Sequence, residues 1–299
     1  MRWRTGALAL GLLLVAASPA SMPANAVVPL AEAPPGYSVT GIDISNHQGA
    51  VDWAAIAAAG TDFAYAKATE GLDYTDPYYA GNLAGANRHR VHFGGYAYGR
   101  PDQGDPRGQA DKLVEVGGYT RTGHGLPPML DIEWPWFGGD DCYGLTPTQM
   151  VTWISEFVDQ VRVRTGRLAM IYTNEYWWNP CTGGSTKFAA HPLFVARYAA
   201  APGTLPAGWS SWTVWQYTNT GSVSGVAGPV DQDVLNGSSE TLIELVRNPN
   251  AWWDPRDPPP ADPDGCYRPA TRQLVCPVEG SAPVDGAPVD GAAPAGAPA

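Results

Sequence analysis

The chain has 299 residues and a formal net charge of −11, with 29 Asp and Glu residues against 18 Lys and Arg residues. This excess of acidic residues disfavours a nucleic-acid-binding protein, which would carry clusters of basic side chains. It also opposes simple electrostatic attraction to an anionic membrane surface. The 12 Trp and 14 Tyr residues combine flat apolar faces with polar groups, which suits both core packing and a groove for sugar rings.

The N-terminus has the layout of a secretory signal peptide. Arg2 and Arg4 precede an apolar run over residues 7–17, and Ala-Asn-Ala follows at 24–26. The apolar run is too short to span a membrane, and a buried first helix fits poorly with the basic start and the Pro- and Ala-rich exit. We therefore expect residues 1–26 to be a signal peptide and the mature protein to be secreted and extracellular, without a membrane anchor.

Composition divides the rest of the chain into four segments. Residues 27–37 read as a short irregular arm, and residues 38–247 carry all the periodic structure and have the length of one domain. Residues 248–280 comprise a Pro- and Asp-rich linker and a segment bracketed by two cysteines. The Ala-, Pro- and Gly-rich residues 281–299 cannot bury a core, so we expect a disordered tail.

Strand-like and helix-like runs alternate within residues 38–247. The best-defined helix covers residues 146–165, with Thr146 as its cap, Pro147 in its first turn and apolar residues along one face. No helix is evident after the sixth or the seventh strand. Eight strands joined by crossovers predict an α/β fold, an irregular (β/α)8 TIM-like barrel with fewer helices in its second half. The predicted strands are 39–45, 63–69, 93–99, 128–133, 168–174, 193–198, 213–218 and 230–235, and the predicted helices are 52–59, 77–89, 109–116 and 146–165.

Two acidic residues, Asp131 and Glu133, end the fourth predicted strand. Residues i and i+2 of a strand point to the same side, roughly 6–7 Å apart, so these side chains project together while Leu130 and Ile132 face the other way. Two acids so close cannot both ionise freely, and one keeps its proton near neutral pH. A general acid beside a carboxylate is what glycosidic bond cleavage needs. The alternative is a pair of solvated acids at a surface strand end.

Further acids lie on the first and eighth predicted strands. Catalytic groups of such barrels gather at the carboxyl ends of the strands, where Asp43 would meet the fourth-strand pair. Asp231 and Asp233 lie on the eighth strand and share one face, so periodicity alone does not choose between them. Asp43 could instead be a structural carboxylate that binds loop amides.

Several motifs appear in one order along the chain: residues 41–49 (Gly-Ile-Asp-Ile-Ser-Asn-His-Gln-Gly), 51–53, 63–71, 95–101, 130–133, 171–173, 215–217 and 230–233. Together they resemble glycoside hydrolase family 25, the Chalaropsis-type lysozymes or N-acetylmuramidases. The resemblance covers residues 38–238, and the barrel of that family is likewise irregular.

This resemblance implies a peptidoglycan hydrolase that cleaves the β-1,4 bond between N-acetylmuramic acid and N-acetylglucosamine. Glu133 matches the proton donor of the family and Asp131 its neighbouring catalytic carboxylate. Asp43 and Asp231 match two further active-site acids, which favours Asp231 over Asp233. We expect Asp131 and partial burial to raise the pKa of Glu133. The expected partner is bacterial peptidoglycan, with the enzyme acting as a monomer and without a cofactor.

Four aromatic residues are candidates for lining the sugar groove, and core packing is the alternative for each: Tyr96, Tyr172, Trp215 and Tyr217. The family often reads Tyr-His-Phe where this chain has Tyr-Ala-Tyr at 96–98. The missing histidine puts one groove contact in doubt but none of the four acids.

Four cysteines fit an oxidising compartment. The simplest pairing joins Cys142 to Cys181 and Cys266 to Cys276, although three connectivities are possible. A zinc site is disfavoured because there is no Cys-x-x-Cys spacing and the five histidines are scattered. We expect no metal.

Two other functions compete with the lysozyme hypothesis. A chitinase-like β-1,4-glycosidase would need further acids two and five residues before Asp131, where this chain has the apolar Met129 and Leu126. A non-catalytic cell-wall glycan-binding module would not need the four acids that this chain retains.

Overall fold

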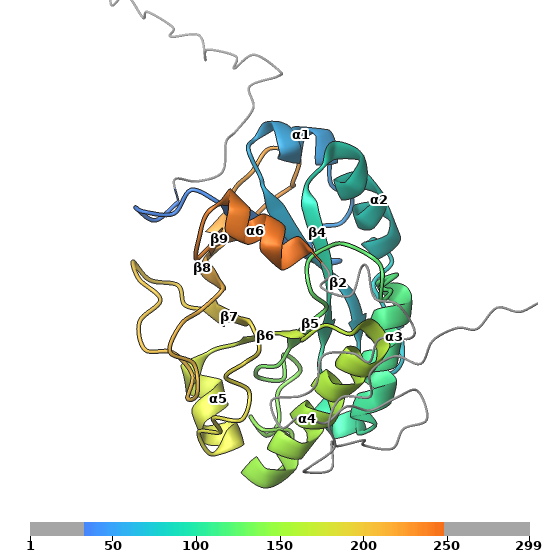
Figure 1. The fold of residues 1–299 in the computed structure, drawn as a ribbon, viewed down its shortest axis with the longest axis vertical. Helices are drawn as coiled ribbons and strands as arrows, with labels where there is room; N and C mark the ends of the chain where they lie inside the picture. Colours follow the sequence, from blue (N-terminus) through green and yellow to red (C-terminus); the bar gives the residue numbers. More distant parts are fainter. Residues whose placement is uncertain (1–32, 248–299) are drawn as a thin grey trace, which may run out of the picture.

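A computed structural model describes residues 33–247 of the chain (Figure 1). Eight strands form a closed barrel, because β1 pairs with β2 as well as with β9. The barrel strands are β1 (Thr40–Ile44), β2 (Phe63–Glu70), β4 (His92–Tyr98), β5 (Met129–Asp131), β6 (Met170–Thr173), β7 (Leu193–Ala196), β8 (Val214–Gly221) and β9 (Val230–Leu235); the short β3 (Tyr74–Thr75) pairs only with β2.

The helices are α1 (Trp53–Ala58), α2 (Tyr79–His89), α3 (Pro106–Val116), α4 (Pro147–Thr165), α5 (Glu175–Thr182) and α6 (Ser239–Val246), with a 3-10 turn, η1 (Pro101–Gln103). Helices α1 to α4 lie along one side of the barrel, whereas α5 lies near β6 and β7 and α6 lies near β8 and β9 (Figure 1). All eight predicted strands and all four predicted helices are present. Within the described residues no helix follows β7 before β8, or β8 before β9. The predicted irregular barrel is confirmed.

The last strand differs from the expected parallel arrangement. β9 runs antiparallel to both β8 and β1, whereas the other barrel pairs are parallel. The connection between β8 and β9 covers only residues 222–229, and a parallel crossover needs a dozen or more residues. Reversal brings the beginning of β9, with Asp231, to the end of the barrel where β1 finishes, and Asp231 is the register partner of Asp43.

Two short helices were not predicted from the sequence. α5 contains Pro180 and spans only eight residues, so its apolar pattern is brief. Its start is nevertheless encoded, since the Asn174 side chain accepts hydrogen bonds from the amides of Tyr176 and Trp177. α6 follows Ser238, a cap residue, and its Leu242 packs with the side chains that fill the barrel interior.

The barrel strands alternate between two apolar layers. Inward residues such as Tyr65, Met129 and Phe194 fill the interior, while outward residues such as Leu130 and Ile171 pack against the helices. Each such side chain contributes roughly 1.5–3 kcal/mol when fully buried. This alternation continues to the end of β5, so a polar side chain at an inward position there emerges at the mouth of the barrel.

The predicted disulfide between Cys142 and Cys181 is present, with a Cα–Cα distance of 5.2 Å. It ties the loop after β5 to the end of α5. Cys266 and Cys276 lie outside the described residues, as do the predicted signal peptide, linker and tail. No helix of the described part is long and apolar enough to cross a membrane.

Candidate active site

The four predicted acids share one cavity of about 640 Å³ at the carboxyl ends of the parallel strands. Asp43 comes from β1, Asp131 and Glu133 from the end of β5, and Asp231 from the start of β9. The barrel closure therefore brings together residues that are far apart in the sequence.

The β5 pair has the predicted orientation. Leu130 and Ile132 are fully buried in the outer layer, whereas Asp131 and Glu133 line the cavity, and Asp131 is 7% exposed. The Gly99 amide donates to the Asp131 carbonyl at 2.8 Å. The Tyr143 hydroxyl donates to the Glu133 carbonyl at 2.9 Å. These bonds fix the backbone that carries both acids, although Glu133 lies beyond the regular strand.

A hydrogen-bonded relay holds Asp43. Gln216 on β8 donates from Nε2 to Oδ2 of Asp43 at 2.6 Å. The Tyr172 and Tyr198 hydroxyls each donate to Oε1 of Gln216 at 2.9 Å. Since two donors occupy the amide oxygen, the amide nitrogen must face Asp43. Asp43 thus receives a fixed donor on one oxygen.

Burial is the main cause of the raised pKa values of the four acids in this cavity. It raises the pKa of Glu133 to about 7, with a further contribution from the negative charge of Asp231 and an opposing one from Lys67. Burial also raises the pKa of Asp231 to about 6. The pKa values of Asp43 and Asp131 are raised well above the ordinary range, first by burial and then by a neighbouring carboxylate. Glu133 therefore keeps its proton into the neutral range.

Glu133 has an electrostatic partner that the strand pattern did not indicate. The negative charge of Asp231, on β9, raises the pKa of Glu133. Glu133 and Asp131 are also coupled, since the charge of Glu133 raises the pKa of Asp131 and such an interaction acts on both carboxyl groups. Strand spacing alone could not show the effect of Asp231, since it says nothing of which strands meet across the mouth.

Sequence reasoning missed a cation in the cavity, Lys67. It lies on β2, is only 8% exposed and forms an ion pair with Glu70, Nζ to Oε2 at 2.5 Å. Its ammonium group lies 5.0 Å from the centre of the Tyr98 ring and lowers the pKa of both Asp131 and Glu133. A lysine at the inward position two residues after Tyr65, in an otherwise apolar strand, was the signal for it.

An aromatic rim was also missed. Trp136, in the loop after β5, lines the cavity while remaining 71% exposed, and its Nε1 donates to Oε1 of Glu70 at 2.9 Å. Tyr74 and Tyr198 are exposed residues that also line the cavity. Exposed aromatic faces beside a polar cleft suit the stacking of sugar rings.

The four predicted groove aromatics divide into two pairs. Tyr96 and Tyr172 line the cavity. Trp215 is completely buried in the outer layer, where its Nε1 donates to the carbonyl of Arg197 at 2.7 Å, and Tyr217 packs beside it. Because Gln216 points inward, its two neighbours on β8 must point outward. The core-packing alternative therefore holds for Trp215 and Tyr217.

Ala97 also belongs to the outer apolar layer. The position at which the family often has histidine thus faces away from the cavity in this chain. Its replacement removes no contact from the cleft.

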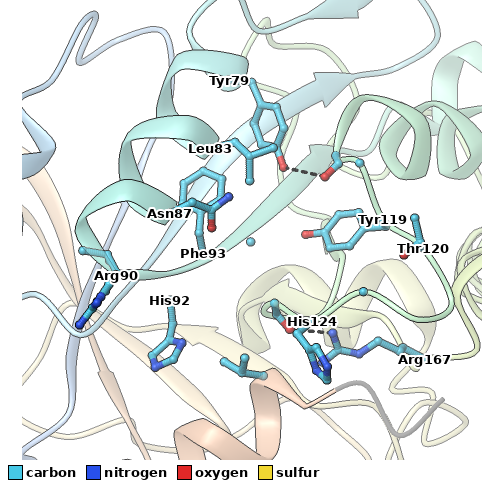
Figure 2. A pocket seen from close by; sticks show the side chains of 17 residues that line it. Tyr79, Leu83, Asn87, Arg90, His92, Phe93, Tyr119, Thr120, His124 and Arg167 are labelled. Atoms are coloured by element: carbon cyan, nitrogen blue, oxygen red, sulfur yellow. Dashed lines mark hydrogen bonds between the residues drawn. The ribbon is translucent and has the colours of Figure 1, made fainter. Parts of the chain in front are cut away.

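A second cavity, of about 420 Å³, lies near the beginning of β4 and contains no acidic side chain (Figure 2). Tyr79, Phe93 and Tyr119 contribute aromatic surface, while the Arg167 guanidinium donates to the carbonyl of Gly125 at 2.6 Å. Without a carboxyl group this cavity cannot supply acid catalysis of glycoside cleavage.

Comparison with known proteins agrees with the acid-lined cleft. The sequence profile of the glycosyl hydrolases family 25 matches residues 42–226. The chain belongs to this family. It is therefore a glycoside hydrolase, and the resemblance seen in the motifs is confirmed.

The relatives are named as lysozymes and muramidases. Lysozyme M1 of Streptomyces globisporus is 42% identical, covering 70% of this chain and 72% of that protein. The N,O-diacetylmuramidase of a Chalaropsis species is 38% identical, covering 70% of this chain and 99% of that protein. The bacterial lysozyme from Streptomyces coelicolor is 41% identical with a TM-score of 0.68, covering 71% of this chain and 99% of that structure.

Proposed function

We propose that this family 25 enzyme is a lysozyme that cleaves the β-1,4 bond between N-acetylmuramic acid and N-acetylglucosamine in bacterial peptidoglycan. The observation that carries the proposal is the convergence of four carboxyl groups, those of Glu133, Asp131, Asp43 and Asp231, in one cavity, where burial raises the pKa of Glu133 to about 7. The activities in the names of its relatives, lysozyme and N,O-diacetylmuramidase, support this choice of glycan.

Glu133 acts as the general acid. Its proton is transferred to the glycosidic oxygen as the bond breaks, which turns a poor leaving group into a neutral alcohol. A pKa near the working pH gives both a large protonated fraction and a proton acidic enough to move. An ordinary glutamic acid, with a pKa near 4.3, would be almost fully ionised at neutral pH.

Asp131 orients the acetamido group of the sugar on the opposite side of the bond. Its Oδ1 is buried and has no hydrogen-bond partner in the described structure. An acetamido N–H would satisfy this oxygen and turn the acetamido carbonyl towards the anomeric carbon. The sugar's own carbonyl oxygen then attacks, in a substrate-assisted displacement of the kind known among glycosidases.

Asp43 and Asp231 stabilise the positive charge that develops on the sugar ring. They face each other across the β1–β9 pair, and the Gln216 relay fixes Asp43 before substrate arrives. Groups that are already oriented cost no reorganisation when charge develops in the transition state. The exposed aromatic rings of Trp136 and Tyr198 provide stacking surface for neighbouring sugars.

The deciding experiment is mass spectrometry of purified peptidoglycan after digestion. A muramidase generates fragments with muramic acid at the reducing end. Fragments that end in reducing glucosamine would overturn the assignment, and unchanged, sedimentable walls that retain bound protein would identify a binding module instead.

We further propose that the enzyme is secreted as a monomer, with residues 38–247 as the catalytic domain and 248–299 as an accessory extension. The basic and apolar residues of the N-terminus support secretion. N-terminal sequencing of protein from the culture medium tests this, since a start near Val27 is expected. Size-exclusion chromatography with light scattering tests the monomer.

A further inference from the structure

A fifth acid, Asp233, lies inside the barrel beneath the cleft. It is two residues after Asp231 on β9 and so shares its inward face. Its exposure is 0%, and neither of its carboxyl oxygens has a hydrogen-bond partner in the described structure. Its register partners are Gly41 on β1 and Gln216 on β8.

Away from the cleft, Asp233 adjoins apolar side chains. The next inward residue, Leu235, belongs to the interior core. Opposite it, Gly41 leaves room for the Phe63 ring, since a Cβ at Gly41 would lie 2.4 Å from a ring carbon. An ionised carboxylate here would have lost its hydration without gaining a donor, which is costly. Burial accordingly raises the pKa of Asp233 well above its usual range.

The acceptor for the retained proton is Asp43, which lies two residues after Gly41, the register partner of Asp233, and points to the same inward side of the barrel. Two carboxylates have no hydrogen to share, and both oxygens of Asp233 then remain without a partner. One proton on Asp233 converts this repulsive contact into a charge-assisted hydrogen bond. Asp43 would then accept from two neutral donors, Asp233 and Gln216.

We propose that Asp233 is a positioning residue: a neutral carboxylic acid that donates a hydrogen bond to Asp43 and, together with Gln216, favours the ionised form of Asp43 and keeps it facing Asp231. The inference rests on the role proposed above for Asp43. It assigns Asp233 no contact with substrate. Asp233 acts by fixing the charge and the direction of the carboxylate above it.

Other titratable groups surround the two carboxyls on every side of the barrel. The tyrosines remain neutral across the pH range of activity, because burial raises the pKa of each. The other carboxyl groups, Asp131, Glu133 and Asp231, also have pKa values raised by burial, and each interacts electrostatically with Asp43. The groups are Asp231 on β9, Tyr65 and the cation Lys67 on β2, Tyr96 on β4, Asp131 and Glu133 at the end of β5, Tyr172 on β6, Tyr198 after β7 and Tyr217 on β8.

Two substitutions separate positioning from packing. Asp233→Asn keeps the size and offers an N–H donor to Asp43, so kcat should stay within about threefold and the acidic limb of the pH profile should not move. Asp233→Leu keeps the branched shape, with larger methyl groups in place of the two oxygens, and removes the donor. It should fold, and kcat should fall roughly ten- to hundredfold with little change in KM, because a hydrogen bond to a charged group is lost.

The proposal also predicts the direction in which the acidic limb of the pH profile moves in Asp233→Leu. Without the Asp233 donor, the ionised form of Asp43 is less stabilised and its pKa rises. The acidic limb of the Asp233→Leu profile should therefore move to higher pH. Glu115→Gln, which neutralises an exposed acid on α3, is the matched control and should leave the profile unchanged.

Three kinetic outcomes would overturn the proposal. If Asp233 were ionised, Asp233→Asn would remove a repelling charge and move the acidic limb to lower pH. If Asp233 only filled space, Asp233→Leu would keep full activity, or both variants would lose activity equally. If it acted independently of Asp43, Asp233→Leu would cost as much in an Asp43→Asn background as in the wild-type enzyme.

An infrared measurement tests the proton without relying on catalysis. The difference spectrum between wild type and Asp233→Asn at pH 7 should contain the carbonyl band of a protonated, buried carboxyl group. Absence of that band would overturn the proposal even if the enzyme proved to be a lysozyme. Its presence in a protein without lysozyme activity would contradict only the proposed function.

Discussion

Asp43 and Asp231 are register partners across the antiparallel β1–β9 pair, and both open into the cleft that contains Glu133. This arrangement depends on the reversal of β9. A parallel eighth strand would have carried Asp231 at its beginning to the opposite end of the barrel. The charge of Asp231 would then not have reached Glu133.

The first prediction concerns Asp231→Asn. The negative charge of Asp231 raises the pKa of Glu133, so neutralising it should lower that pKa and deprotonate the acid at lower pH. The basic limb of kcat/KM should therefore move to lower pH, by more than in Asp131→Asn. Strand spacing alone predicted the opposite order. The carboxyl groups titrate as a coupled set, so the basic limb reports an apparent pKa of the whole set and not of Glu133 alone. The test is therefore the difference in displacement of this limb between Asp231→Asn and Asp131→Asn. A larger displacement of the basic limb in Asp131→Asn would instead support the expectation from strand spacing, that Asp131 has the larger effect on the pKa of Glu133.

The second prediction concerns Lys67, whose removal should displace the basic limb in the opposite direction. Lys67 lowers the pKa of Glu133 and of Asp131, so Lys67→Met should move the basic limb to higher pH. The variant should also lower kcat, since the pair with Glu70 is lost. Arg107→Met, on an exposed ion pair with Glu156 on the outer helices, is a control that should leave the profile in place. A limb that moves to lower pH would contradict the electrostatic role given to Lys67.

The sequence predicted most of the barrel because its strands and longer helices carry strong local patterns. It also predicted the β5 pair and the Cys142–Cys181 bond. Three features depended on spatial neighbours instead: the direction of β9, the outward orientation of Trp215 and Tyr217, and the electrostatic effect of Asp231 on Glu133. The direction of β9 could have been predicted, because the β8–β9 connection is too short for a parallel crossover. Asp233 was noticed only as a rival of Asp231, because alternation places both on one face without showing which is buried.

The third prediction links the proton of Glu133 to stability. Its folded pKa of about 7 lies above an unfolded value near 4.3, so the folded state binds more protons between these values and stability falls as pH rises through this window. The wild-type enzyme should have a higher Tm near pH 5 than near pH 8. Glu133→Gln should abolish hydrolysis and remove this dependence in part, with a gain of roughly 3–4 kcal/mol near pH 8.

Thermal unfolding at both pH values, together with turbidity assays on cell walls, checks this prediction. Circular dichroism should show an unchanged fold for Glu133→Gln. Normal hydrolysis by the well-folded variant would remove Glu133 from its proposed role. A Tm of Glu133→Gln near pH 8 that equals or falls below that of the wild-type enzyme would show that burial of the ionised carboxyl does not destabilise the fold.

The last prediction places the end of the catalytic domain after α6. The final turn of this helix is fixed to the barrel, because the Gly125 amide donates to the carbonyl of Val246 at 3.1 Å and the Arg167 guanidinium donates to that of Leu245 at 2.5 Å. Leu242 of the same helix packs into the barrel interior. Truncation after Arg247 should therefore leave a folded enzyme that is active on soluble glycan fragments. Truncation after Leu235 removes α6 and should lower the free energy of unfolding by at least the roughly 2–5 kcal/mol lost when a buried leucine is deleted. Urea unfolding of the two truncated proteins measures the difference. An insoluble protein ending at Arg247, or equal stability of both, would move the domain boundary.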